Sequence, residues 1–178
     1  MTHSLLKELL ELRASFKSSS GEDLERKIRR RTEIHLKYPE YDPMLEAWRP
    51  IAEKYREMFK GKILDAGCGS GYLYHFLGKP SGYVGVDISP SFIKVAREFA
   101  PEADFRVQDF LRMTEHFDMA WCSSLVFPKM KVKADDALSL LKRLAPSGIL
   151  VFASGHGPDF SYPAEQFGRM WAHVWRTD

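Results

Sequence analysis

Residues 63–71 read Ile-Leu-Asp-Ala-Gly-Cys-Gly-Ser-Gly, a short apolar run that leads directly into three alternating glycines. The apolar run is typical of a buried strand, and the residues that follow the last glycine are typical of a helix. Glycines at 67, 69 and 71 let the chain turn sharply and let a ligand approach the backbone where side chains would collide. An ordinary tight connection between strand and helix is the alternative interpretation, so the surrounding residues must decide.

Two further apolar runs are followed by an aspartate in the same way. Asp87 closes the next run 22 positions after Asp65, and Asp109 follows the run after that, another 22 positions on. The carboxyl ends of parallel strands line one crevice, where open α/β folds bind ligands. Asp87 can accept hydrogen bonds from a ribose diol. It is not needed as a helix cap, because Ser89 and Pro90 already provide a good helix start. These positions favour a ligand with an adenosine part.

Short apolar runs alternate with helical patterns from residue 62 onward. Such alternation predicts an α/β fold, namely a Rossmann-like, doubly wound, mostly parallel sheet of about five strands with helices on both faces. The expected strands cover residues 63–66, 83–87, 104–107, 117–122 and 149–153, and the expected helices cover residues 71–77, 90–99 and 134–144.

The first sixty residues predict helices instead. Apolar spacing indicates one helix over about residues 5–16, a charged helix over 24–36 and a third that begins at Asp42-Pro43 and is kinked or divided at Pro50. We therefore expect a helical extension over residues 1–60, followed by a ligand-binding domain over residues 61–178. Tyr38 and Tyr41 precede the third helix and are candidates either for a lid or for ordinary packing.

Composition limits the class of protein. The chain has 178 residues, 44% hydrophobic and 28% charged, with 26 Lys and Arg against 24 Asp and Glu. This is enough for one core, and the net charge of +2 lacks the strong excess of a dedicated nucleic-acid binder. Two cysteines form neither a disulfide framework nor metal-ligand spacing, so we expect no metal. Without a recognisable signal or membrane-spanning run, we expect a cytoplasmic protein and no membrane partner.

The motifs together resemble the class I S-adenosylmethionine-dependent methyltransferases over residues 61 to about 153. The resemblance rests on the glycine loop at 64–71, on Val-Gly-Val-Asp-Ile-Ser at 84–89 and on Gln-Asp-Phe at 108–110. Residues 117–124 are similar to that family's fourth strand, and residues 141–151 to the helix, turn and fifth strand that follow it.

The resemblance implies S-adenosylmethionine as cofactor and places its parts. Its methionine part would lie over the loop, its ribose on Asp87, its adenine between Ile88 and Phe110 with the amine near Asp109, and its methyl end beside Cys122 and Ser123. The implied cofactor-binding residues are Asp65, Ala66, Gly67, Cys68, Gly69, Gly71, Tyr72, Asp87, Ile88, Gln108, Asp109, Phe110, Cys122 and Ser123.

A nicotinamide cofactor is the competing interpretation of the loop. That pattern requires a third glycine at position 72, where this chain has Tyr72. The methyltransferase interpretation is therefore preferred.

The chain departs from the family near its end. Members continue past the fifth strand with a helix and an antiparallel pair of strands, and 25 residues after Ala153 are too few for both, so we expect this hairpin to be missing. The fifth strand would then be an open apolar edge. We expect Trp171 and Trp175, four apart on one helix, or a second subunit in a homodimer, to cover it. A shortened form of the chain is the remaining alternative.

The acceptor is less determined than the cofactor. His156, between two glycines after the fifth strand, is the best-placed candidate base, although a structural role is also open. We expect methyl transfer to nitrogen or oxygen of a small molecule. An RNA methyltransferase that uses the basic run at 25–31 and a non-catalytic cofactor-binding module are the alternatives.

Overall fold

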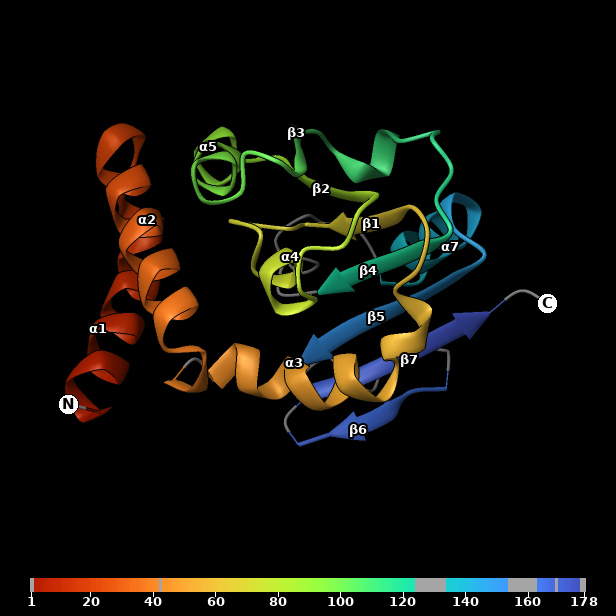
Figure 1. The fold of residues 1–178 in the computed structure, drawn as a ribbon, viewed down its shortest axis with the longest axis horizontal. Helices are drawn as coiled ribbons and strands as arrows, with labels where there is room; N and C mark the ends of the chain where they lie inside the picture. The colour runs from red at the N-terminus through yellow and green to blue at the C-terminus, as the bar shows by residue number, and fades with distance from the viewer. Residues whose placement is uncertain (1, 42, 124–133, 154–162, 169, 177–178) are drawn as a thin grey trace.

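A computed structural model describes residues 2–41, 43–123, 134–153, 163–168 and 170–176. The strands form one sheet in the order β3-β2-β1-β4-β5-β7-β6 (Figure 1). Strands β1 to β5 pair in parallel, as expected from the alternation of strands and helices. Their bounds are β1 Ile63–Ala66, β2 Tyr83–Asp87, β3 Asp104–Val107, β4 Met119–Ser123, β5 Ser147–Ala153, β6 Glu165–Phe167 and β7 Met170–Arg176.

The expectation of a missing hairpin is wrong. Strand β7 pairs antiparallel with the whole of β5, from Ser147 opposite Arg176 to Ala153 opposite Met170, and β6 pairs antiparallel with β7. The sheet therefore has seven strands rather than about five, and β5 lies inside it. The 25 residues suffice because β6 has only three residues and a tight turn follows it. A second subunit is not needed to cover β5.

The segment with Trp171 and Trp175 is a strand, not a helix. A spacing of four places two side chains on one face of a strand as well as on one face of a helix, which is why the spacing misled. Both indoles pack on one side of the sheet, and the alternate residues Met170, Ala172 and Val174 pack on the other.

Helices cover both faces of the sheet, as predicted. One face carries α3 (Pro43–Lys54), α4 (Tyr72–Phe76) and α5 (Pro90–Phe99), whose apolar side chains share a core with Ile63, Phe105 and Trp121 of the strands. The other face carries α7 (Ala134–Leu144) and the 3₁₀ turn Phe110–Arg112. The structure is thus three layers with the sheet in the middle (Figure 1).

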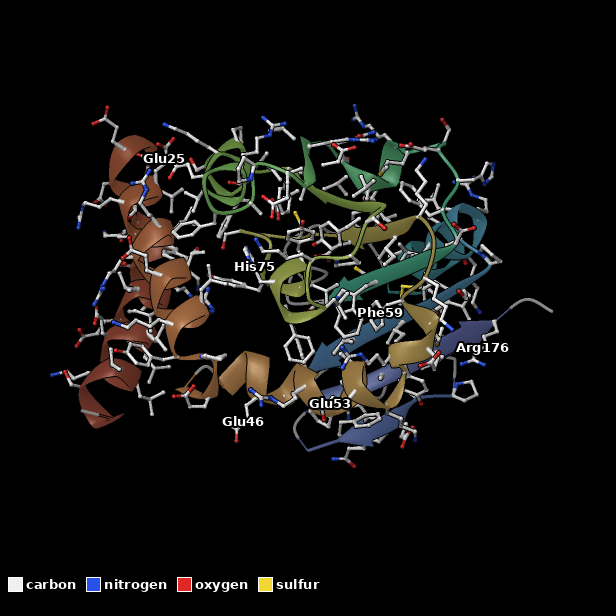
Figure 2. The ribbon with its side chains drawn as sticks, in the orientation of Figure 1. Glu25, Glu46, Glu53, Phe59, His75 and Arg176 are labelled. Atoms are coloured by element: carbon white, nitrogen blue, oxygen red, sulfur yellow. The ribbon has the colours of Figure 1, made fainter. Side chains whose placement is uncertain are left out.

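The N-terminal helices are α1 (Thr2–Ser15) and α2 (Gly21–Lys37), which lie beside α5 and α4 (Figure 1). Helix α3 runs through Pro50 without being divided there, and its Trp48 and Ile51 are buried in the core of the sheet. Phe59, which follows α3 in the chain and is labelled in Figure 2, also contacts Trp121, with ring centroids 5.7 Å apart. Tyr38 is half-buried at the end of α2, and the side chain of Tyr41 lies outside the described residues.

Charged residues of α2 are used for packing. Arg29 donates to both carboxylate oxygens of Glu98 on α5 at 2.7 and 2.8 Å, and Lys94 of α5 pairs with Glu25 at 2.5 Å. Arg30 pairs with Glu8 of α1 at 2.7 Å. The basic run at 25–31 is therefore largely occupied by partners within the chain, and the expectation that it binds RNA loses its main observation.

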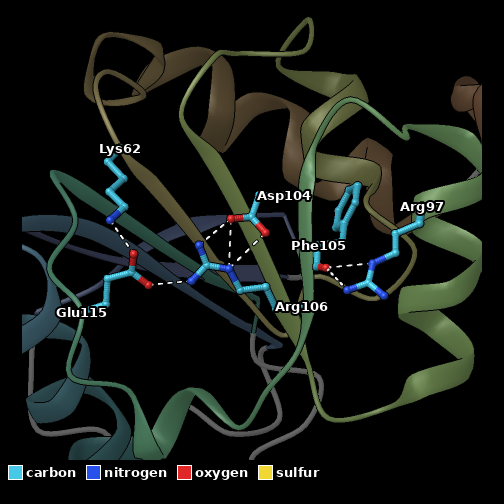
Figure 3. Close-up of polar contacts among 6 residues, drawn as sticks. All are labelled: Lys62, Arg97, Asp104, Phe105, Arg106 and Glu115. Atoms are coloured by element: carbon cyan, nitrogen blue, oxygen red, sulfur yellow. Dashed lines mark hydrogen bonds and ion pairs between the residues drawn. The ribbon is translucent and has the colours of Figure 1, made fainter.

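A second charged group lies at the amino-terminal edge of the sheet. Figure 3 shows Glu115 between Lys62 and Arg106, with contacts of 2.5 and 2.6 Å, and Arg106 also paired with Asp104. The two cations and two carboxylates of this group balance in charge. No described helix is long and apolar enough to cross a bilayer.

Candidate functional site

The glycine loop connects β1 to α4 and bends three times in the left-handed region. The φ angles are +80° at Gly67, +55° at Gly69 and +82° at Gly71. Only glycine adopts these angles without strain, which explains the alternating pattern in the sequence.

The three glycines do different work. A Cβ atom at Gly67 would meet nothing within 4 Å, and one at Gly69 would meet only Phe92, at 3.8 Å. A Cβ at Gly71 would lie 2.6 Å from the ring of Phe105, which is buried under the loop. Phe105 lies on β3, and Arg97 of α5 holds this strand by donating to the Phe105 carbonyl oxygen, with Nε at 3.0 Å (Figure 3). Gly71 therefore serves packing, whereas Gly67 and Gly69 leave the surface of the loop open.

Backbone hydrogen bonds tie the loop to the end of β2. The amides of Gly67 and Cys68 donate to the Val86 carbonyl at 2.8 and 3.0 Å, and the amide of Gly69 donates to Asp87 Oδ2 at 3.1 Å. The first and second aspartates of the sequence pattern are thus joined through the loop itself.

Asp87 has a second structural partner, since its Oδ1 accepts the Ser89 amide at 2.9 Å. The sequence had suggested that Ser89 caps α5 and leaves Asp87 free for a ligand. The Ser89 side chain makes no capping bond, and Asp87 accepts the Ser89 amide instead. Each carboxylate oxygen keeps a further acceptor position. Burial raises the pKa of Asp87, although the amides of Ser89 and Gly69 oppose this shift.

Asp65 is the most buried acid of the site, at 3% exposure. The hydroxyl of Tyr83 donates to its Oδ2. Burial raises the pKa of Asp65 to about 7, the Tyr83 bond opposes the shift, and the charge of Asp87 adds to it. The site therefore holds a carboxyl that changes charge near neutral pH and that a nearby cation would stabilise as the anion.

Tyr83 is a functional residue that sequence reasoning missed. In the register of β1 and β2, Ile63 pairs with Tyr83 and Asp65 pairs with Gly85. The Tyr83 hydroxyl reaches Asp65 on the neighbouring strand, and the side chains of Phe105 and Cys68 fill the space over Gly85. Alternation places residues 63 and 65 on one face of β1 and residues 83 and 85 on one face of β2, but only the pairing of the two strands brings the Tyr83 hydroxyl to Asp65.

Residues after β2 and β3 form the next part of the edge. The Gln108 amide donates to the Asp87 carbonyl at 3.0 Å, and Asp109 Oδ1 accepts the Leu111 amide at 3.0 Å. Ile88 is 57% exposed beside these acids, whereas Phe110 is buried. An exposed isoleucine flanked by hydrogen-bonding groups suits one face of a flat, partly polar ring.

The remaining predicted residues lie on β1, β4 and α4. Ala66 pairs with Cys122 in the sheet, and Ser123 ends β4 on the face opposite to Cys122. Burial and the charge of Asp65 raise the pKa of the Cys122 thiol, and burial together with Asp65 and Asp87 raises that of Cys68, which disfavours the reactive thiolate form of both. Tyr72 is buried, with its hydroxyl toward α2. His156 lies outside the described residues.

Part of the chain is similar in sequence to known methyltransferases. A family model described as a methyltransferase domain matches residues 63–148. The ubiquinone biosynthesis O-methyltransferase of Actinobacillus pleuropneumoniae serotype 7 is 31% identical over 121 residues, which cover 58% of this chain and 50% of that protein. The malonyl-[acyl-carrier protein] O-methyltransferase of Bacillus cereus is 31% identical over 114 residues, covering 60% and 42%. The matches thus span about half the length of these relatives.

Solved structures share the fold. The PH0226 protein of Pyrococcus horikoshii superposes with a TM-score of 0.61 at 21% identity over 80% of this chain and 93% of that one. Magnesium protoporphyrin IX methyltransferase of Synechocystis, solved with bound S-adenosylmethionine, gives 0.54 at 18% identity over 96% and 97%. Sequence motifs, strand order and family match agree: residues 63–148 match a methyltransferase domain, and the fold is similar to that of the class I S-adenosylmethionine-dependent methyltransferases.

Proposed function

We propose that this protein binds S-adenosylmethionine at the carboxyl ends of β1 to β4 and transfers its methyl group to nitrogen or oxygen of a small-molecule acceptor. The observation that carries the proposal is the open surface at Gly67 and Gly69, next to the buried carboxyl group of Asp65 and the half-buried carboxyl group of Asp87. A cofactor with two cationic groups and a ribose diol matches this combination of space, negative charge and acceptors.

The proposal gives a role to the predicted residues at the ends of β1, β2 and β3. Asp87 accepts from the ribose hydroxyls with the acceptor positions that Gly69 and Ser89 leave free. Ile88 covers one face of the adenine, and Gln108 and Asp109 border its edge. The loop from Asp65 to Gly71 holds the methionine part, where Asp65 faces its positive charge.

When bound, S-adenosylmethionine supplies a methyl carbon that an acceptor lone pair attacks while the carbon–sulfur bond breaks and its electrons remain on sulfur. The chain aligns the two reactants, and alignment alone lowers the barrier of such a displacement substantially. An acceptor that must lose a proton also needs a base, for which we propose His156. The burial and raised thiol pKa values of Cys68 and Cys122 argue against covalent catalysis by either residue.

Two observations bear on the acceptor. The two relatives named above are both called O-methyltransferases, which favours oxygen over nitrogen. The alternative of an RNA acceptor is weakened by the internal ion pairs of Arg29 and Arg30. The alternative of a non-catalytic module rested on the missing hairpin, and that hairpin is present.

Calorimetry with the whole chain tests the cofactor, and transfer of a radiolabelled methyl group tests the reaction. We expect S-adenosylmethionine and its demethylated product S-adenosylhomocysteine to bind with micromolar dissociation constants, and NADH not to bind. Label should enter phenols or carboxylic acids in preference to amines, and RNA should remain unlabelled. Binding of NADH without binding of either sulfur compound would refute the proposal.

The affinity for S-adenosylmethionine should increase with pH. Below the Asp65 pKa of about 7 the carboxyl of the free protein holds a proton that must leave when a cation binds beside it. We expect the dissociation constant to fall by several-fold, and at most about tenfold per unit, between about pH 6 and pH 8. Asp65→Asn should bind more weakly at pH 8 and lose this dependence. An equally steep pH profile in Asp65→Asn would assign the proton to another group.

A further inference from the structure

Helix α2 contacts the glycine loop from behind through one face. Arg31, Thr32 and His35, all buried, meet the side chain of Tyr72, the first residue of α4. The guanidinium of Arg31 lies 6.0 Å from the centre of the Tyr72 ring, and the His35 and Tyr72 rings are 4.5 Å apart. The N-terminal helices are therefore packed directly onto the residue that follows the loop.

Thr32 links this contact to the loop itself. Its Oγ1 atom lies 2.9 Å from Ser70 Oγ, 3.2 Å from Tyr72 Oη and 2.8 Å from the Ile28 carbonyl oxygen. Thr32 and Ser70 both have 0% exposure. A hydroxyl has one donor and two acceptor positions, so the Thr32 hydroxyl can satisfy all three partners without water.

Ser70 lies in the middle of the glycine loop, so a contact at its side chain restricts the backbone on both sides. It stands between Gly69 and Gly71, whose φ angles are +55° and +82°, and glycine gains more conformational freedom than other residues when it is released. Gly69 also donates to Asp87. A fixed Ser70 side chain therefore keeps the neighbouring backbone in the bend that presents the Gly69 amide to Asp87.

We propose that Thr32 is a positioning residue of the cofactor site, which holds the glycine loop through Ser70 and makes cofactor affinity depend on α2. The proposal rests on the proposed function, because it assigns a role toward the cofactor of that site. Thr32 touches no cofactor in it and acts only through the loop. Helix α2 thereby contributes to the affinity of the site for its cofactor.

Calorimetry with S-adenosylhomocysteine on the full chain tests the proposal. Thr32→Val keeps the shape of the side chain and removes the hydroxyl, and Ser70→Ala removes its partner. We expect each variant to bind about three- to tenfold more weakly, the range expected for loss of one buried hydrogen bond. Thr32→Ser should restore the parent affinity. The double variant should bind no more weakly than Thr32→Val alone, because Thr32→Val already removes the bond to Ser70 together with the Thr32 contacts to Tyr72 and Ile28.

Ile28→Val is the matched control, since Ile28 is buried on the same helix at 0% exposure. It should lower the melting temperature and leave the dissociation constant unchanged. All affinities are measured well below the melting temperatures, so that every variant is folded. Unchanged affinity in Thr32→Val, or additive losses in the double variant, would overturn the role of Thr32 while leaving the function intact. A parent chain that binds no S-adenosylhomocysteine would overturn the proposed function instead. If Thr32→Val does not fold, Ser70→Ala and Thr32→Ser still decide the matter.

Discussion

Replacement of Asp87 by Ala should weaken the binding of S-adenosylhomocysteine by about 30- to 300-fold, as measured by calorimetry. The change removes a charged acceptor for the ribose hydroxyls, and hydrogen bonds to charged groups are among the stronger ones. It also removes the acceptor of the Gly69 amide at 3.1 Å and of the Ser89 amide at 2.9 Å. Loss of ligand contact and loss of loop anchoring therefore act together.

Two further variants separate these effects. Asp87→Asn keeps one acceptor oxygen and should lose less affinity than Asp87→Ala. Asp104 lies on β3, and its carboxylate pairs with Arg106 at the amino-terminal edge of the sheet. Asp104→Ala should therefore bind S-adenosylhomocysteine as the parent does. Parent-like affinity in Asp87→Ala would rule out the ribose assignment.

Replacement of Trp175 by Ala should lower the free energy of unfolding by about 3 to 5 kcal/mol, measured by urea denaturation. The indole is 5% exposed, pairs opposite Gly148 in β5, and its Nε1 donates to the Ala145 carbonyl at 3.1 Å. A Cβ at Gly148 would collide with the Trp175 ring, so the ring lies directly on β5. Its removal leaves a cavity over the strand that the sequence had predicted to be an open edge.

Trp171 provides the comparison within the same strand and on the same face of the sheet. It is only half-buried, so Trp171→Ala should cost clearly less stability than Trp175→Ala. Both variants should still bind S-adenosylhomocysteine when folded, because the hairpin lies beyond β4 and β5 in the sheet. Equal and small losses in the two variants would show that the hairpin contributes little to the fold.

The backbone geometry of the candidate cofactor site and the placement of its aspartates could be predicted from the sequence. Left-handed backbone at Gly67, Gly69 and Gly71 follows from glycine itself, and alternating strands and helices bring Asp65 and Asp87 to one edge of a parallel sheet. These features depend on short stretches of chain and on general rules of α/β topology. They were predicted residue by residue and agree with the strand order.

Long-range packing decided the rest. The spacing of Trp171 and Trp175 fits a helix face and a strand face equally, and only pairing with β5 selects the strand. In the sequence, the basic run at 25–31 resembles a phosphate-binding surface. In the structure, Arg29 pairs with Glu98 and Arg30 pairs with Glu8.

The sequence by itself determined the parallel sheet, the glycine loop and the acidic strand ends, because each is written in local composition and spacing. Only the tertiary structure decided that β5 is covered, that Tyr83 reaches Asp65 and that Thr32 meets Ser70, 38 positions away. Side chains that satisfy one another across such distances leave no periodic signal, since their partnership arises from the packing of whole elements and not from their neighbours in the chain.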